Sequence, residues 1–349
     1  MASDFLRRAS LAAVGLAVIA ALGAGMAGQA RAADPLKVRF ILNWKYQGPQ
    51  AWFFLADDKG YFKQAGIDIQ LDQGAGSGAA VPKVASTAYD AGFGDINAIT
   101  RFASKNQGRQ PVAVYMIYNQ TPFVIATPKS AKVMKPRQLE GMTLGAPAND
   151  GAFKLFPAFA NIAGIDATKV SWQHMKPNLR VTMLKRGKVQ GVSGYHLTVL
   201  FDALRVGMNP DRDLDFMRFA DFGMDLYSNA VMVSQEMLNN HPDKVKGMVG
   251  AINKAFWEVV ANPEVGLDAV MRREPLLKRA SEKERMMATL KHLILSPEMK
   301  KVGMGDTDPV RLKRSIDIVA TAFKLQRTPE PDEVFQSRFL PPLKDRMGR

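Results

Sequence analysis

The stretch DQGAGSGAAVPKV, residues 72–84, decides how the rest of the chain is interpreted. It follows the alternating run IDIQL at 67–71, which is typical of a strand, and it leads into a helical pattern. Its glycines allow the backbone to approach a ligand closely, and N–H groups at a helix N-terminus favour negative charge. The stretch therefore predicts a strand–loop–helix unit, with either a ligand at the loop or a plain tight turn.

The sequence contains two consecutive α/β patterns, and this loop lies in the first of them. The first pattern has expected strands at 36–44, 66–71, 91–96 and 111–118, and expected helices at 50–62, 79–89 and 97–105. The second has extended segments at 122–127, 141–145, 170–174, 189–193 and 215–219, with helices ending near 164 and at 178–185. Residues 227–233 are extended and could cross back, and the chain from 235 onward reads as helical. This alternation predicts two α/β units with largely parallel sheets, and ligands in such sheets bind beyond the carboxyl ends of the strands.

The N-terminus has the features of an export signal. Arg7 and Arg8 precede an apolar run at 11–27, and an Ala-x-Ala motif ends at Ala32. We therefore expect residues 1–32 to be a signal peptide cleaved near Ala32, with a retained anchor as the minor alternative. The twin arginine allows either general secretory or twin-arginine export. We find no later run of 18 or more uncharged apolar residues.

Charge and cysteine content limit the possible functions. The formal net charge is +14, of which the first 32 residues supply +2 from three arginines and one aspartate. A basic exported chain fits solvated lysines or a site that attracts anionic solutes. Nucleic acid is not an expected partner, because the basic residues are scattered and form no arginine-rich arm. The chain has no cysteine, so disulfides, thiolate metal sites and cysteine nucleophiles are excluded.

The glycine loop also raises an enzymatic alternative. Gly74 to Ala79 fits the dinucleotide pattern G-x-G-x-x-G/A, and Asp95 follows at a strand end. An exported NAD(P)-dependent oxidoreductase is therefore the alternative function. The pattern opens after a complete βα unit, whereas the dinucleotide fingerprint normally opens the fold. The four histidines lack metal-ligand spacing and no G-x-S-x-G elbow is present, so the sequence offers no catalytic residue set.

Several longer segments resemble a known family. The run NWKYQGPQAWFFLADDKGYFKQAGIDIQLDQGAGSGAAVPKV at 43–84, followed by YDAGFGDINAI at 89–99, is similar to the periplasmic solute-binding proteins of ABC importers. The resemblance is strongest to binders of thiamine pyrimidine precursors, taurine and alkanesulfonates. Later matches are LEGMTLGAPAND at 139–150, LKRGKVQGVSGY at 184–195 and LYSNAVMVSQEML at 226–238. Some relatives are pyrimidine synthases with a cysteine-rich iron motif, which this chain lacks.

The resemblance implies the type II periplasmic-binding-protein fold, with two α/β lobes, hinge crossovers and closure on a ligand. It implies a first lobe at 33–120, a second lobe at 121–234, and C-terminal helices at 235–349 that return to the first lobe. The expected protein is a periplasmic monomer with no catalytic activity and no cofactor. It would deliver a small organic solute to a membrane permease.

The resemblance also places the ligand at strand ends and at the loops beside them. The implied ligand-binding residues are Asn43, Trp44, Tyr46, Gln47, Gly76, Ser77, Gly78, Asp95, Asn97, Asn119, Asn149, Asp150, Gly151, Ser193, Tyr195, His196, Tyr227 and Asn229. Uncharged donors with neighbouring aromatic rings suit a pyrimidine-like heterocycle, a sulfonate or an aromatic acid. Asp95 and Asp150 would favour an amine or amidine on the ligand, although each could instead be a helix N-cap.

Overall fold

The first of two sheets contains the strand that precedes the glycine loop. In this computed structural model, which describes residues 34–348, the sheet order is β2-β1-β3-β10-β4. Its strands are β1 (Leu36–Ile41), β2 (Ile67–Asp72), β3 (Ala91–Asp95), β4 (Val112–Met116) and β10 (Asn229–Val233). Strand β10 runs antiparallel between β3 and β4, so residues 227–233 do cross back to this sheet as predicted. All that follows belongs to the compact unit Leu36–Arg349.

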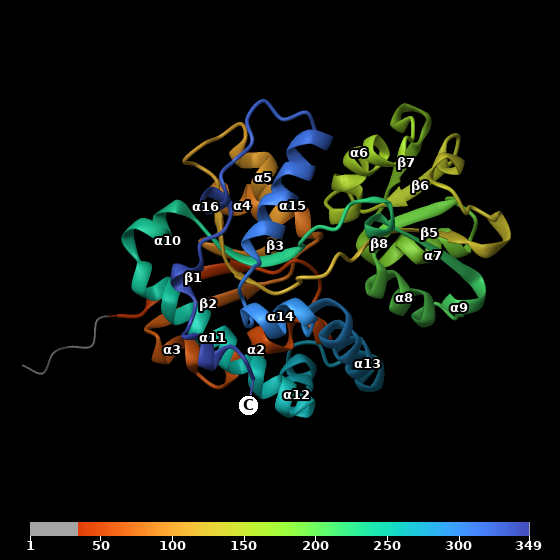
Figure 1. The fold of residues 1–349 in the computed structure, drawn as a ribbon. Coiled ribbons are helices and arrows are strands. Elements are labelled where there is room, and N and C mark those ends of the chain that lie inside the picture. Colours follow the sequence, from red (N-terminus) through yellow and green to blue (C-terminus); the bar gives the residue numbers. More distant parts are fainter. Residues whose placement is uncertain (1–33, 349) are drawn as a thin grey trace, which may run out of the picture. The chain divides into compact units, whose positions relative to one another are not determined.

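The second sheet repeats this design with the order β7-β6-β8-β5-β9. Its strands are β5 (Phe123–Pro128), β6 (Thr143–Ala146), β7 (Ser171–His174), β8 (Gly191–Tyr195) and β9 (Leu214–Arg218). Strand β6 is parallel to β7 and β8, whereas β5 is antiparallel to β8 and β9. We call each sheet with its helices a lobe. The chain passes to the second lobe after β4 and returns before β10 (Figure 1).

Helices cover both sheets. The helices are α2 (Ala51–Asp58), α3 (Tyr61–Gln64), α4 (Ala80–Ala85), α5 (Ile96–Ala103), α6 (Gly151–Ala163), α7 (Arg180–Lys185), α8 (His196–Arg205), α9 (Pro210–Asp213), α10 (Gln235–Asn240), α11 (Pro242–Ala261), α12 (Pro263–Arg273), α13 (Arg279–Thr289), α14 (Pro297–Val302), α15 (Pro309–Ala322) and α16 (Pro331–Val334). The helix expected at 50–62 is divided at Gly60, whose φ of 69° ends α2 because glycine adopts this conformation without steric cost.

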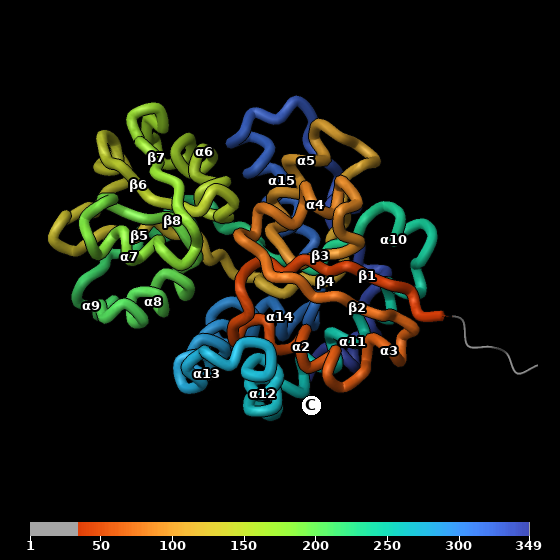
Figure 2. Tube along the Cα trace, turned by 180° about the vertical axis from the view of Figure 1, so that it is seen from behind, coloured from red at the N-terminus to blue at the C-terminus, as the bar shows by residue number. Residues whose placement is uncertain are grey.

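The C-terminal helices lie mainly beside the first sheet, as both views show (Figures 1 and 2). Helices α11 and α12 pack against α2, whose aromatic residues Trp52, Phe53 and Phe54 are fully buried. Helix α13 reaches α8 of the second lobe, and α15 contacts both α5 and α6. These contacts bring the late part of the chain to the boundary between the lobes. The exact lobe boundaries at 120/121 and 234/235 stay predictions, and the expected signal peptide lies outside the described residues.

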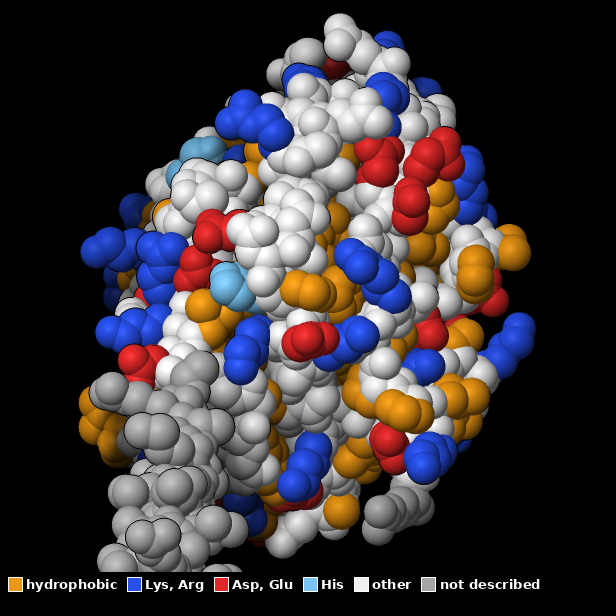
Figure 3. Space-filling model, turned by 90° about the vertical axis from the view of Figure 1, so that its left-hand side faces the viewer, with side chains coloured by type: hydrophobic (Ala, Val, Ile, Leu, Met, Phe, Trp, Pro, Cys, Tyr) orange, Lys and Arg blue, Asp and Glu red, His pale blue; other side chains and the backbone are white. Residues whose placement is uncertain are grey.

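The surface carries charges of both signs. On the face shown in Figure 3, lysine and arginine side chains are dispersed with acidic side chains among them, and no continuous basic stripe is visible. This is the distribution expected for solvated lysines. Within residues 34–348 we find no helix with the length and apolar character needed to cross a bilayer.

Candidate functional site

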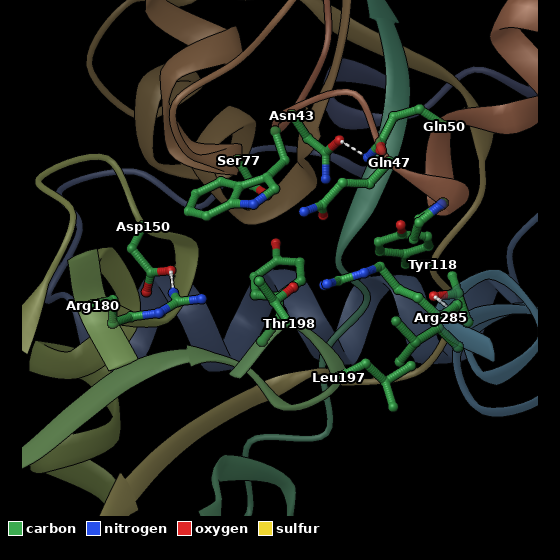
Figure 4. A pocket seen from close by; sticks show the side chains of 15 residues that line it. Asn43, Gln47, Gln50, Ser77, Tyr118, Asp150, Arg180, Leu197, Thr198 and Arg285 are labelled. Carbon is green, nitrogen blue, oxygen red and sulfur yellow. Dashed lines mark hydrogen bonds and ion pairs between the residues drawn. The ribbon is translucent and has the colours of Figure 1, made fainter. Parts of the chain in front are cut away.

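A small cavity lies between the lobes at the carboxyl ends of their strands (Figure 4). Its volume is about 40 Å³. The segments after β1 and β2 contribute one wall, the starts of α6 and α8 contribute the opposite wall, and α13 adds further residues. Six predicted site residues line it: Asn43, Trp44, Gln47, Ser77, Asp150 and Tyr195. The structure thus brings residues from both α/β units to one place.

The cavity also has lining residues that the sequence did not single out. They are Pro49, Gln50, Tyr118, Arg180, Leu197, Thr198, Arg285, Thr289 and Leu293. Gln50 lies next to the predicted Asn43 and Gln47 in space, and its Nε2 donates to Oδ1 of Asn43 over 2.9 Å. A signal for it existed, because it follows a Gly-Pro turn just after the strand end. The two arginines gave no such signal, since each sits in an ordinary helical pattern.

The N–H groups of the three loop glycines Gly74, Gly76 and Gly78 have partners inside the protein and are not free for a ligand. The N–H groups of Gly74 and Gly76 donate to the carbonyls of Trp44 and Asn43, and that of Gly78 donates to the carbonyl of Asn149. A Cβ on Gly76, whose φ is 141°, would lie 2.1 Å from the Asn149 carbonyl oxygen. The expectation that these glycines donate to a solute is therefore wrong for the backbone. The glycines let the two lobes touch.

This use of the loop also removes the basis of the dinucleotide alternative. A pyrophosphate cradle needs free N–H groups at a helix N-terminus. Here the N–H groups of Gly78 and Ala79 donate to the carbonyls of Asn149 and Gly76, and the helix that follows, α4, has only six residues. The described residues also contain no group of three or more His, Asp or Glu side chains arranged to hold a metal ion. The NAD(P)-dependent oxidoreductase is not supported.

Asn229 and Gly151 are predicted site residues that do not line the cavity but lie where the lobes meet beside it. The Tyr195 hydroxyl donates to Oδ1 of Asn229, and Nδ2 of Asn229 donates to the Ser77 hydroxyl at 3.1 Å. Ser228 also donates to the Tyr195 hydroxyl. Because Tyr195 ends β8 and Asn229 begins β10, this network joins the two sheets. A Cβ on Gly151 would lie 3.0 Å from the ring of Tyr195. A glycine at this position therefore leaves room for the ring.

The remaining predicted residues have partners inside the protein and do not line the cavity. The hydroxyl of Tyr46 donates to the Leu71 carbonyl, Asn97 donates to Asp95 and to the Tyr227 carbonyl, and Asn119 donates to the Ile294 carbonyl. Ser193 donates to Asp150 at 3.0 Å, and Tyr227 donates to Glu298. Their side chains support the strand ends and the two crossings between lobes.

Asp150 combines two roles that the sequence presented as alternatives. Its Oδ1 accepts from the Phe153 N–H as the N-cap of α6, and its Oδ2 lies 3.2 Å from Nη1 of Arg180. Arg180 is 1% exposed and also pairs with Asp202 at 3.5 Å. Asp150 lines the cavity, but its charge is already balanced by an arginine. Asp150 is therefore not free to pair with an amine on the ligand.

Asp95 lies outside the cavity. It is the N-cap of α5, and its Oδ1 accepts from the backbone N–H and from Nδ2 of Asn97. Burial raises the pKa of Asp95 to about 7, although the hydrogen bonds from Asn97 and the charge of Arg101 oppose the shift. A carboxyl held in this way supports the helix and does not reach a solute in the cavity.

His196 also lies away from the cavity. Its ring packs edge-on against Phe216 at 4.6 Å between centroids. Burial, the charge of Arg218 and nearby His292 lower the pKa of His196 to about 4. The imidazole is thus neutral at physiological pH and belongs to the packing of α8 on the second sheet.

Arg285 is the clearest polar group without a partner in the cavity. It is 5% exposed, and its Nη1 has no hydrogen-bond partner among the described residues. Its Nε lies 3.4 Å from Oε1 of Glu282, whose Oε2 accepts from the Gly48 N–H. Figure 4 shows the guanidinium directed into the space between Gln47 and Thr198. A buried N–H donor without an acceptor is costly, so a ligand acceptor close to Nη1 would stabilise it.

Gln50 supplies the opposite kind of unpaired group. Its Oε1 is buried and has no donor among residues 34–348, while its Nε2 is fixed by Asn43. The cavity therefore presents one cationic side chain with an unbonded N–H group, Nη1 of Arg285, and one unbonded acceptor, Oε1 of Gln50. The ring of Tyr195 and the side chain of Leu197 add apolar surface. This combination matches a small planar solute with an anionic group and an N–H or O–H donor.

Two α/β lobes, two chain crossings and a cavity at the facing strand ends define the fold of periplasmic binding proteins, which confirms the predicted fold class. The family model described as NMT1/THI5 like matches residues 49–265, more than half of the chain. The chain belongs to this family.

Individual relatives are distant. The riboflavin-binding protein RibY of Chloroflexus aurantiacus is 19% identical over 292 residues, which are 83% of this chain and 82% of the relative. The 4-amino-5-hydroxymethyl-2-methylpyrimidine phosphate synthase of Aspergillus parasiticus is 21% identical over 250 residues, 69% of this chain and 72% of that protein. The alkanesulfonate-binding protein SsuA of Xanthomonas axonopodis pv. citri bound to MOPS has a TM-score of 0.62 at 14% identity, covering 87% and 99% of the two chains.

Proposed function

We propose that this protein is the periplasmic solute-binding component of an ABC importer. It captures a small organic solute in the cavity between its lobes by hinge closure and delivers it to a membrane permease. The observation that carries the proposal is the buried guanidinium of Arg285 in that cavity, whose Nη1 has no hydrogen-bond partner among the described residues. It acts as a monomer without catalytic activity, and residues 1–32 direct it to the periplasm. The similarity to a riboflavin-binding protein and to sulfonate-binding structures supports a transport role.

The cavity favours some solute classes over others. Arg285 would pair with a carboxylate or sulfonate, since charge-assisted hydrogen bonds are the stronger ones. Gln50 Oε1 would accept from a ring N–H, an amino group or a hydroxyl. Aromatic or heterocyclic acids and sulfonates therefore fit better than a purely cationic amine. The pyrimidine phosphate synthase among the relatives supports a pyrimidine-like ring as the apolar part of the solute.

A thermal-shift screen tests this function. The chain from residue 33 onward is mixed in turn with pyrimidines, sulfonates, aromatic acids, riboflavin, NAD and NADP. A ligand at about a hundred times its Kd adds roughly 2.7 kcal/mol to the stability of the folded state, which gives a clear upward shift. We expect a shift with one small anionic solute and none with the nucleotides.

The variant Arg285→Gln shows whether that solute uses the proposed cavity. It should abolish the shift, because the variant keeps a similar length but loses the charge. The matched control is Arg186→Gln, which removes an exposed arginine after α7 and should leave the shift unchanged. A shift with NAD or NADP alone would overturn the proposed function. A solute shift that Arg285→Gln leaves intact would place the site elsewhere.

A further inference from the structure

A second and larger hollow opens beside the candidate cavity. This groove has a volume of about 530 Å³, and Gly78 lines it while the neighbouring Ser77 lines the cavity. The glycine loop therefore separates the two spaces. The first lobe contributes α4, α5 and the segment that follows α15 to the groove, and the second lobe contributes α6 through Lys154 and Leu155.

The groove is strongly basic. Arg101, Lys105, Lys154 and Lys324 line it, and none of them has an ion pair with an acidic side chain among residues 34–348. Elsewhere the described structure pairs many of its arginines and lysines, for example Arg272 and Arg273 with Asp57 and Asp58. Several unpaired cations around one hollow create a positive potential that attracts an anion.

Among the described residues that line the groove, Asp95 is the single acidic one, and it opposes an anion only weakly. Asp95 is 1% exposed, and one of its oxygens is occupied by Asn97. Burial raises the pKa of Asp95 to about 7, so at neutral pH a large share of this carboxyl is uncharged.

The groove also has an apolar lining. Val81, Phe102, Leu155 and Leu325 contribute to it, and the Arg101 guanidinium lies 4.2 Å above the ring of Phe323. A hollow of several hundred Å³ with apolar walls and a few charged groups has the form of a small-molecule site. We propose that this groove is a second ligand site, separate from the solute cavity, and that it binds an organic anion with an apolar body.

Such a ligand would act on closure because both lobes form the groove. Nη1 of Arg101 donates to the Lys154 carbonyl over 3.1 Å, and the Gly78 N–H donates to the Asn149 carbonyl. Both bonds join the first lobe to the second, so the groove is complete only when the lobes are together. An anion between Lys154 and the first-lobe cations therefore favours the closed form. By linkage it also raises the affinity for a solute that binds the closed form.

The probe for this site is 8-anilinonaphthalene-1-sulfonate, whose fluorescence rises on binding. It is titrated into the wild-type protein and into the double variant Lys105→Gln/Lys324→Gln, which changes two exposed side chains of the groove. We expect the Kd of the probe to rise about threefold to tenfold in this variant, because each of the two lost charges is exposed and contributes only a small part of the binding free energy. The control Lys37→Gln/Lys188→Gln removes one exposed lysine from each lobe outside the groove and should change the Kd less than twofold.

Two further measurements separate the alternatives. N-phenyl-1-naphthylamine has the same apolar body without the sulfonate, and its Kd should be equal in all three proteins. Hydrogen exchange at residues 74–80 and 149–155 should slow when the sulfonate probe is bound, and unchanged exchange would overturn the coupling to closure. Equal Kd values in the groove and control variants would overturn the site itself. So would a loss of probe binding in Arg285→Gln alone, because the anion would then occupy the solute cavity.

Discussion

The hydroxyl of Tyr195 donates to Oδ1 of Asn229 across 2.7 Å, and this bond joins the last residue of β8 to the first residue of β10. The two residues belong to different sheets, and both are buried. Ser228 and Ser77 extend the contact through hydrogen bonds to the same two side chains. The closed arrangement of the lobes thus depends on a few polar groups at the strand ends, next to the cavity.

Tyr195→Phe should favour the open form. The variant keeps the ring that fills the space beside Gly151 but removes the bond to Asn229. A net hydrogen bond is worth roughly 0.5–1.5 kcal/mol, so the closed-to-open ratio should fall about twofold to twelvefold. Small-angle X-ray scattering should then give a larger radius of gyration. Tyr61→Phe is the control, because that hydroxyl bonds to Glu258 within the first lobe; an equal change in both variants would argue against this role of Tyr195.

Gly76→Ala should obstruct closure more strongly. The new Cβ would lie 2.1 Å from the Asn149 carbonyl oxygen of the other lobe, and the φ of 141° disfavours any side chain. Scattering should report an open molecule, and exchange at residues 146–152 should increase. Gly78→Ala is the matched comparison, since its Cβ meets Lys154 Cγ at 3.2 Å and the Asn149 oxygen at 3.3 Å. If both variants close like the wild type, the loop is not the contact that limits closure.

Arg180→Met should destabilise the protein. Arg180 is 1% exposed and pairs with Asp150 and Asp202, so its loss leaves buried Asp150 without a counter-charge and Asp202 with only the exposed Arg205 at 3.8 Å. Breaking a buried pair in this way costs about 3–5 kcal/mol in the free energy of unfolding. Urea denaturation measures the change. Arg205→Gln touches the same Asp202 from an exposed position and should cost less than about 1 kcal/mol; equal losses would contradict a structural role for the buried pair.

Much of the fold follows from local patterns. The strand at 67–72, the loop after it and the extended segment at 229–233 could be predicted because alternation and glycine content act within a few residues. The antiparallel insertion of β10 between β3 and β4 could only be anticipated as a return crossing. Its pairing depends on two strands that are distant along the chain.

The site was less predictable. Asn43, Gln47 and Ser77 could be predicted because they follow strands, and strand ends face the cleft. Arg285 could not, because a helical pattern does not show which of its charged residues meets the other lobe. The prediction that the loop glycines donate to a solute failed for a similar reason. The acceptor of the Gly78 N–H is the carbonyl of Asn149, in a segment that only the closed fold brings near.

Asp95→Asn should change how stability depends on pH. Burial raises the pKa of Asp95 from 3.8 to about 7, so the folded state keeps a proton that the unfolded state has released between these values. The stabilisation is therefore complete below about pH 4 and is lost as the pH rises through about 7. Asparagine keeps an N-cap oxygen for α5 but does not titrate.

The wild-type free energy of unfolding should consequently fall relative to that of Asp95→Asn between pH 4 and pH 8, by up to about 4 kcal/mol. Urea denaturation of both proteins at several pH values gives this difference directly, and all other titrating groups cancel in it. Asp68→Asn, on the exposed side of β2, is the control for the loss of an aspartate that is not buried. A flat difference for Asp95→Asn would mean that this carboxyl is ionised in the folded protein, and the groove beside it would then carry a full negative charge.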